Sequence, residues 1–206
     1  MHIPDGYLDP SIATITYLLS IAYLAYSLHR CKLSSESEKL SAITVFAATI
    51  FVAQMINWPI PGGTSLHFLG GALVGIVLGP WVGSVTIFLV LLVQCLIFHD
   101  GGITALGANT LNMAIVAVVS GYLIYRSTRR RMGGMLASFV AGWISVALAG
   151  LVCGVELGLS SNFIYNIYVT VPVMGGWHLA LGLIEGLITS MVVRYLEARS
   201  PHYVGS

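Results

Sequence analysis

Long apolar runs alternate with short polar or glycine- and proline-rich segments along the whole chain. A helix needs about 20 residues to cross a bilayer core of about 30 Å, and most of these runs come close to that length. The run from Leu66 to Phe98 carries no charged residue, and we divide it at Gly79-Pro80, where a helix is expected to stop. The pattern therefore predicts an all-α, polytopic membrane protein of seven transmembrane helices. They span residues 11–28, 40–57, 66–79, 81–98, 105–125, 134–157 and 173–196.

The third of these predicted helices is too short to cross a membrane by itself. Residues 66–79 would make a helix of about 21 Å. We therefore expect it to begin below the outer surface, with the preceding segment 57–65 (NWPIPGGTS) dipping into the membrane. Irregular backbone at that depth must line a cavity within the protein, because lipid offers no hydrogen bonds. This arrangement places His67 at the bottom of a cavity.

The composition supports a membrane protein of one domain. Of the 206 residues, 57% are hydrophobic and 8% are charged, whereas soluble domains carry about 25% charged residues. We expect a single integral membrane domain over 1–206, made of an amino-terminal segment 1–10, a helix bundle 11–196 and a tail 197–206. No basic stretch precedes the first apolar run and no small-residue cleavage site follows it, so we expect no signal peptide and a retained Met1.

The basic residues predict how the protein is oriented in the membrane. If the helices alternate in direction, all nine Lys and Arg residues fall on one side, and basic residues stay in the cytoplasm. The amino terminus would then lie outside and the carboxyl terminus in the cytoplasm. The net charge of +1 gives no indication of nucleic-acid binding. The basic positions are Arg30, Lys32, Lys39, Arg126, Arg129, Arg130, Arg131, Arg194 and Arg199.

The first two residues, Met1 and His2, offer a chelating set of nitrogens. A free Met1 amine, the His2 main-chain nitrogen and the His2 imidazole Nδ1 can close fused rings of five and six members around one metal ion. The main-chain nitrogen binds only after it loses its proton, which requires a strongly Lewis-acidic metal. Planar nitrogen sites are typical of Ni(II) or Cu(II). Such a chelate leaves one corner of the plane open, and an imidazole is suited to fill it.

Five other histidines are candidates for the open corner. His29 and His202 lie on the cytoplasmic side in the predicted orientation, whereas His99 and His178 remain open. His67 has the best predicted placement, in the outer cavity.

Several motifs together resemble the substrate-binding component of nickel/cobalt energy-coupling-factor transporters, the CbiM/NikM family. The resemblance runs from residue 1 to about residue 190, nearly the whole chain. It implies that the metal is held by the Met1 amine, the His2 main-chain nitrogen, the His2 imidazole and the His67 imidazole. The motifs are MHIPDGYL at the start, PGGTSLHFLGGAL around His67, LGPW at 78–81, DGGITALGANTLNM at 100–113 and HLALGLIEGLIT at 178–189.

The resemblance also implies a function and a set of partners. A member of this family captures Ni(II) or Co(II) outside the cell membrane and takes it up together with a transmembrane coupling protein and two cytoplasmic ATPases. A small accessory membrane subunit is a further expected partner, and cobalt uptake would serve cobalamin biosynthesis. The chain contains no Walker A motif and is expected to hydrolyse no ATP itself. It would need no catalytic cofactor, because the metal ion is the transported substrate. The planar ligand set favours nickel slightly over cobalt.

Other marked residues are candidates for supporting roles near the metal. These are Asp5, Ser65, His99, Asp100 and Asn109. Asp5-Gly6 is a pair typical of turns, and we expect the Asp5 side chain to form a hydrogen bond within that turn before we assign it a role near the metal.

Glu185 is the one carboxylate deep in a predicted span, where ionisable groups are costly and usually functional. We expect it to have a structural or coupling role.

Two other classes of function remain open from the residues alone. An intramembrane metalloenzyme could use His67, His178 and Glu185, although no H-E-x-x-H spacing is present. A passive metal channel or an assembly scaffold would also fit a helical membrane domain.

Overall fold

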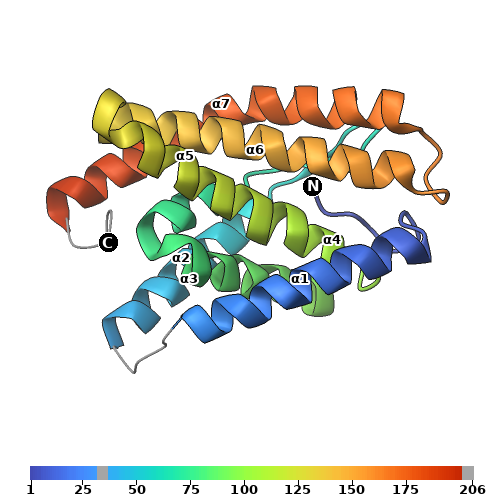
Figure 1. The fold of residues 1–206 in the computed structure, drawn as a ribbon, viewed down its shortest axis with the longest axis horizontal. Helices are drawn as coiled ribbons and strands as arrows, with labels where there is room; N and C mark the ends of the chain where they lie inside the picture. Colours follow the sequence, from blue (N-terminus) through green and yellow to red (C-terminus); the bar gives the residue numbers. More distant parts are fainter. Residues whose placement is uncertain (32–36, 201–206) are drawn as a thin grey trace.

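The computed structural model describes residues 1–31 and 37–200. It is a bundle of long helices, with the amino terminus drawn into its middle (Figure 1). The helices are α1 (Pro10–Arg30), α2 (Ser37–Gln54), α3 (Gly71–Val93), α4 (Leu106–Asn109), α5 (Ala117–Met132), α6 (Gly134–Leu159) and α7 (Ile167–Arg199). The π-helical turns η1 (Gln94–Phe98) and η2 (Thr110–Val116) continue α3 and join α4 to α5, and two short strands are β1 (Trp58–Pro59) and β2 (Ser65–Leu66).

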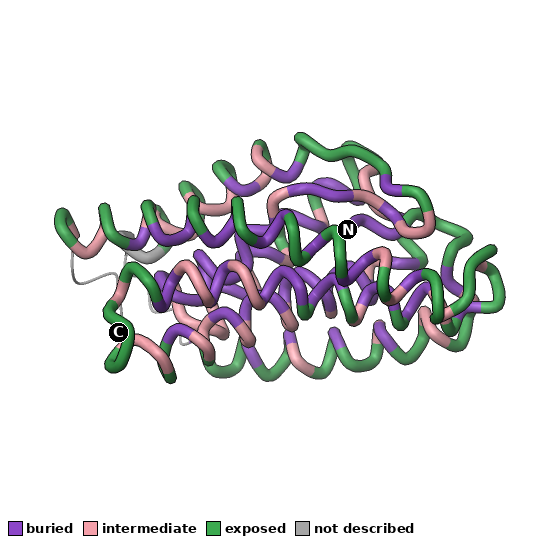
Figure 2. The backbone as a smooth tube through the Cα atoms, turned by 90° about the horizontal axis from the view of Figure 1, so that it is seen from above, coloured by how far each residue is buried: buried purple, intermediate pink, exposed green. Residues whose placement is uncertain are grey.

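The helices confirm that the protein is a membrane protein. In the described part of the chain, five stretches are long and apolar enough to span a bilayer, and Leu40–Gln54 forms a shorter apolar helix. Large apolar side chains on their outer faces are exposed, for example Leu18 at 63% and Ile184 at 58%, and Figure 2 shows the buried residues along the interior. Exposed apolar faces of this extent suit contact with lipid. The count of seven spans and the orientation remain predictions.

The predicted break at Gly79-Pro80 is confirmed. Gly79 has a non-helical backbone, with φ 79° and ψ 166°, and Pro80 follows it. The two halves of α3 then pack on each other, because a Cβ atom on Gly83 would lie 3.0 Å from the Val74 carbonyl oxygen. The chain therefore folds back between 74 and 83.

The irregular segment before α3 is longer than predicted. Residues 57–65 are non-helical as expected, but β2 (Ser65–Leu66) pairs antiparallel with β1 (Trp58–Pro59), and α3 begins at Gly71. The prediction of a helix from residue 66 is wrong, because the strand pairing and the left-handed backbone of Gly70 (φ 75°) delay the helix start. His67 consequently lies in an irregular segment, 67–70, and not in a helix.

Small residues allow the close approach of α6 and α7, which run side by side (Figure 1). A Cβ atom on Gly142 would lie 2.8 Å from the Gly186 Cα atom, and one on Gly150 would lie 2.6 Å from the His178 Cβ atom. Glycine spacing of this kind is a common basis of helix packing in membranes. The paired helices form a wall against which the amino-terminal segment lies.

A large apolar groove lies between α2 and α7. Its volume is about 510 Å³, and Phe46, Ile50, Leu181 and Ile188 are among its lining residues. Glu185 is the one charged residue in the lining. The groove shows that α2 and α7 are not packed tightly on each other along this length.

Candidate metal-binding site

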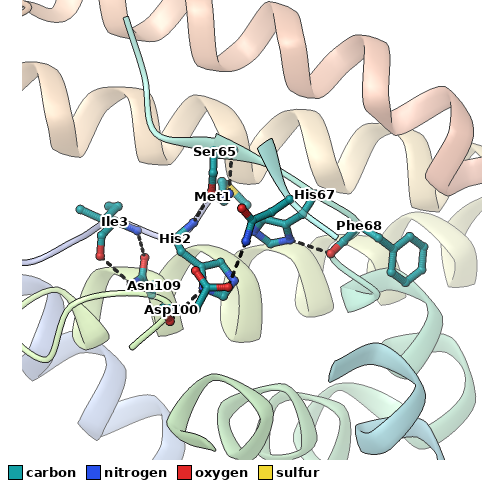
Figure 3. Close-up of polar contacts among 9 residues, drawn as sticks. Met1, His2, Ile3, Ser65, His67, Phe68, Asp100 and Asn109 are labelled. Atoms are coloured by element: carbon teal, nitrogen blue, oxygen red, sulfur yellow. Dashed lines mark hydrogen bonds and ion pairs between the residues drawn. The ribbon is translucent and has the colours of Figure 1, made fainter. Parts of the chain in front are cut away.

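The first three residues of the chain are buried. Met1 and Ile3 are 0% exposed and His2 is 4% exposed, and Met1 belongs to the main hydrophobic core. The Ile3 N–H donates to Asn109 Oδ1 at 2.8 Å, and Asn109 Nδ2 donates to the Ile3 carbonyl at 3.1 Å (Figure 3). The Gly102 N–H donates to the same carbonyl at 2.8 Å. These bonds hold the segment between the loop after η1 and the start of the fifth predicted span.

Asp5 holds the amino-terminal segment in place at a second point, after Ile3. Its Oδ1 accepts hydrogen bonds from the Thr104 N–H at 2.7 Å and the Thr104 hydroxyl at 2.6 Å. These bonds, with the Thr104 hydroxyl first, lower the pKa of Asp5. The partner expected from the sequence, within the turn at Gly6, is therefore replaced by one 99 residues away. Gly102 permits this approach, because a Cβ atom there would lie 2.2 Å from the Asp5 nitrogen.

Ser65 is the point on which the first two main-chain nitrogens converge. The Met1 α-amine donates to the Ser65 carbonyl at 2.5 Å and to Ser65 Oγ at 2.9 Å. The His2 N–H approaches the same Oγ at 3.2 Å. Two nitrogens of the expected chelate thus face one half-buried side chain, as Figure 3 shows.

His67 lies directly beside His2. The two rings have centroids 4.5 Å apart and meet edge to face at 78°. His67 is 0% exposed, and its Nδ1 donates to the Phe68 carbonyl at 2.8 Å (Figure 3). This bond fixes the tautomer, since a carbonyl only accepts. The lone pair then lies on His67 Nε2, which has no partner among the described residues.

Asp100 holds the His2 ring from the opposite side. His2 Nδ1 lies 3.2 Å from Asp100 Oδ1 and 3.1 Å from its carbonyl oxygen, and Asn57 Nδ2 donates to Asp100 Oδ2 at 3.0 Å. Burial pushes the pKa of Asp100 upward, but the interactions of Asp100 with His2, the Met1 amine and Asn57 together outweigh it, and the net pKa is lowered. Asp100 therefore presents an ionised carboxylate to the His2 ring.

Burial favours the neutral form of two nitrogen groups of the site, the Met1 amine and the His67 imidazole. It lowers the pKa of the Met1 amine to about 5. It also lowers the pKa of His67 well below its usual value, with the Met1 amine and His2 acting in the same direction. Neutral amines and imidazoles carry the lone pairs that metal ions bind.

Of the other described histidines, two lie at the surface, whereas His178 is buried close enough to the Met1 amine and His67 to interact with them electrostatically. His99 is exposed at the end of η1, with a left-handed φ of 54°, and His29 is exposed at the end of α1. His178 is buried in α7, where its Nδ1 donates to the Met174 carbonyl at 2.7 Å. His202 and Lys32 lie outside the described residues.

Two contributors were missed from the sequence. Asn57 bonds to Asp100, and Gln54 Nε2 donates to the Leu69 carbonyl at 2.7 Å. A glutamine near the end of an apolar run is a feature of the sequence that could have drawn attention to Gln54.

The site is built mainly from main-chain nitrogens and imidazoles. In residues 1–31 and 37–200, no group of three or more His, Cys, Asp or Glu side chains is placed to hold a metal ion. A site that includes the Met1 amine and a peptide nitrogen does not need such a group.

The whole fold is similar to that of a known transporter. A crystal structure described as that of a truncated transition metal transporter superposes with a TM-score of 0.91 and 36% sequence identity. The match covers 96% of this chain and 99% of the other. Together with the apolar helices, it defines the class: this chain is an integral membrane protein with the fold of a known transition metal transporter.

The sequence comparisons identify the family within that class. Residues 2–203 match the CbiM family, described as the cobalt uptake substrate-specific transmembrane region, and the chain belongs to this family. A relative from Archaeoglobus fulgidus, named "Putative fused nickel transport protein NikMN", is 55% identical over 99% of this chain and 68% of its own length. The cobalt transport protein CbiM of Sorangium cellulosum is 29% identical over 98% of this chain and 93% of its own length.

Proposed function

We propose that this protein captures Ni(II) or Co(II) at the outer face of the cell membrane, as the substrate-binding subunit of an ATP-driven energy-coupling-factor transporter. Membership of a family described by cobalt uptake supports the substrate class. The 55% identical relative carries a nickel transport name, and planar nitrogen coordination favours nickel. We therefore place nickel first and cobalt a close second.

The metal ligands in this proposal are four nitrogens. They come from the Met1 amine, the His2 main chain, the His2 imidazole and the His67 imidazole. The observation that supports this set best is the convergence of the first two on Ser65 Oγ, at 2.9 and 3.2 Å, beside a His67 ring 4.5 Å from the His2 ring. Nε2 of His67 carries the free lone pair of that ring and has no hydrogen-bond partner in the described part of the chain.

Binding of the ion requires local changes that the contacts define. The His2 ring must turn its Nδ1 away from Asp100, to which it now bonds, and the proton on Nδ1 must leave or move to Nε2 before Nδ1 can bind the ion. The Met1 amine and the His2 nitrogen must exchange the Ser65 oxygens for the metal, and the His2 nitrogen must lose its proton. Ca(II) and Mg(II) prefer oxygen ligands and would be rejected.

Transport against a gradient needs an energy source. The sequence has no Walker A motif, so a transmembrane coupling protein, two cytoplasmic ATPases and a small accessory membrane subunit complete the proposal. In it, seven helices cross the membrane, with the amino terminus outside and the basic ends of α5 and α7 in the cytoplasm. Arg129, Arg130 and Arg131 lie in the last turn of α5, and Arg199 in that of α7.

The alternatives are less well supported. For a metalloenzyme, Glu185 would need a free carboxylate oxygen, but both oxygens accept backbone N–H bonds. A passive channel would conduct metal ions in vesicles that contain this chain alone, whereas a substrate-binding subunit would bind them and conduct none. Ion flux in such vesicles decides between the two.

A single residue added ahead of Met1 tests the proposed ligand set. We expect Ni(II) affinity to fall by at least about 100-fold, because the loss of a ligand exceeds the roughly 10–100-fold cost of losing an outer partner. Isothermal titration of purified protein with a native amino terminus, verified by mass spectrometry, gives the reference. The control carries the same residue after Ser206. Equal affinity of the amino-terminally extended protein and the reference would refute the chelate.

A further inference from the structure

The segment that carries His67 leads directly into α3, and no side chain of this segment caps the start of that helix. A helix start leaves several N–H groups without partners inside the helix. Gly70, which precedes α3, has no side chain and makes no capping bond. In the membrane interior these N–H groups need partners from elsewhere in the protein.

Glu185 of α7 supplies partners for two N–H groups just ahead of the first turn of α3. The Leu69 N–H donates to Glu185 Oε2 at 2.7 Å, and the Gly70 N–H donates to Glu185 Oε1 at 2.8 Å. Glu185 is 1% exposed. Both carboxylate oxygens are therefore used on two consecutive N–H groups, more than 100 residues away in sequence. A carboxylate in the wall of an apolar groove would be costly without such bonds.

Gln54 of α2 completes the attachment from the other side. Its Nε2 donates to the Leu69 carbonyl at 2.7 Å, and its side chain is 0% exposed. The peptide between Leu69 and Gly70 thus has its N–H on α7 and its carbonyl on α2. This peptide therefore connects α2 and α7 by hydrogen bonds at a place where an apolar groove separates the two helices.

The peptide between Phe68 and Leu69 connects Glu185 to the His67 ring. Its carbonyl accepts from His67 Nδ1 at 2.8 Å, and its N–H donates to Glu185 Oε2 at 2.7 Å. Because a peptide unit is planar, a fixed N–H direction fixes the direction of the carbonyl. The carbonyl in turn fixes the tautomer and orientation of His67, as outer partners do for metal-binding histidines.

We propose that Glu185 is a positioning residue for the proposed metal ligand His67 and acts on its ring through the Phe68–Leu69 peptide. This inference rests on the proposed function, because it assigns Glu185 a part in the same metal site. A capping role alone would stabilise α3 without affecting metal affinity through His67. The two roles differ in how Glu185 and His67 depend on each other.

The experiment is a double-mutant cycle on Ni(II) affinity in the full-length protein with a native amino terminus. Glu185→Gln turns one acceptor oxygen into an amide that faces an N–H. We expect about 10–100-fold weaker binding, the usual cost of losing an outer partner of a ligand. In the His67→Ala background the same change should add less than about twofold, since its effect passes through the missing ring.

Glu156→Gln is the matched control. Glu156 is also a buried carboxylate, 6% exposed, and it accepts from Asn112 Nδ2 at 2.6 Å and not from the backbone of residues 67–70. We expect it to keep Ni(II) affinity within about threefold, a change below 1 kcal/mol where tenfold is 1.4 kcal/mol. Equal losses from both glutamate variants would overturn the inference, because they would show a general effect of buried carboxylates.

The outcomes separate this inference from the proposed function. Wild-type affinity in His67→Ala refutes the ligand set itself. If His67→Ala weakens binding while Glu185→Gln has no effect, or has the same effect in both backgrounds, only the role of Glu185 is refuted. If Glu185→Gln yields no folded protein, the cycle is run with Glu185→Asp, whose shorter side chain draws the carboxylate back from the Leu69 and Gly70 N–H groups. Independence of Glu185→Asp and His67→Ala would then overturn the inference.

Discussion

His67 and His178 are two buried histidines that share almost every local feature. Both are 0% exposed. Each donates from Nδ1 to a main-chain carbonyl, at 2.8 Å for His67 and 2.7 Å for His178. In the described part of the chain, neither Nε2 has a partner. Burial and a fixed tautomer therefore do not distinguish a proposed metal ligand from a packed ring.

Their surroundings separate them. The His178 carbonyl partner is Met174, one turn earlier in the same helix, and Gly150 of α6 makes room for the ring. The His67 ring lies against His2, and its segment is held by Glu185 and Gln54 from two other helices. The useful distinction is the set of nitrogens that face each ring and the long-range support of its backbone.

The largest expected difference between the two histidines is in metal affinity. His67→Ala should weaken Ni(II) binding by at least about 100-fold, because it removes a ligand and not only an outer partner, whose loss costs about 10–100-fold. Titration of the purified variant against a competing chromogenic chelator measures the change. Binding within threefold of wild type would place the fourth ligand elsewhere and remove the contrast with His178.

The sequence was sufficient for features that depend on local chemistry. The stop at Gly79-Pro80 follows from the backbone limits of those two residues, and structure confirms it. The helix start at residue 66 was wrong, because it depends on pairing of Leu66 with Trp58, which apolar periodicity does not reveal. The left-handed backbone of Gly70 also prevents α3 from beginning before Gly71.

The candidate site shows the same limit. Met1 and His2 could be selected from their chemistry, since a terminal amine next to a histidine is a chelating pattern in any fold. His67 was selected by its predicted place in the outer cavity and by the family resemblance. The partners of Asp5 and Glu185 could not, because Thr104 and Leu69 lie 99 and 116 residues away. A carboxylate in an apolar span indicates a role, but its hydrogen-bond partner is set by tertiary packing.

A smaller effect should come from the backbone that presents His67. Gly70→Ala places a Cβ atom 2.8 Å from the Ile50 Cδ1 and Cγ1 atoms, and a left-handed backbone costs an L-residue about 1–2 kcal/mol. We expect Ni(II) affinity to fall about tenfold as the segment shifts, on the scale where 1.4 kcal/mol is tenfold. Titration calorimetry measures it.

Gly133→Ala is the control for this strain. Gly133 has a similar φ of 78°, and nothing lies within 4 Å of the added Cβ atom. It joins α5 to α6, away from His67. We expect lower thermal stability and unchanged metal affinity. A loss of affinity in Gly133→Ala as large as in Gly70→Ala would mean that general destabilisation, and not the presentation of His67, explains both.

The smallest expected effect is that of His178→Leu on metal affinity. The change removes a buried imidazole whose Nδ1 bond stays within α7, and it leaves the Ser65, His2 and His67 contacts in place. We expect Ni(II) affinity within about threefold of wild type, below 1 kcal/mol on the scale of 1.4 kcal/mol per tenfold, with an unchanged ligand-field absorption spectrum. The melting temperature of the variant should fall, because the His178 side chain packs closely against Gly150 and leucine has a different shape. An affinity loss as large as that of His67→Ala, with a shifted spectrum, would make His178 a ligand. The two histidines would then differ in backbone support but not in function.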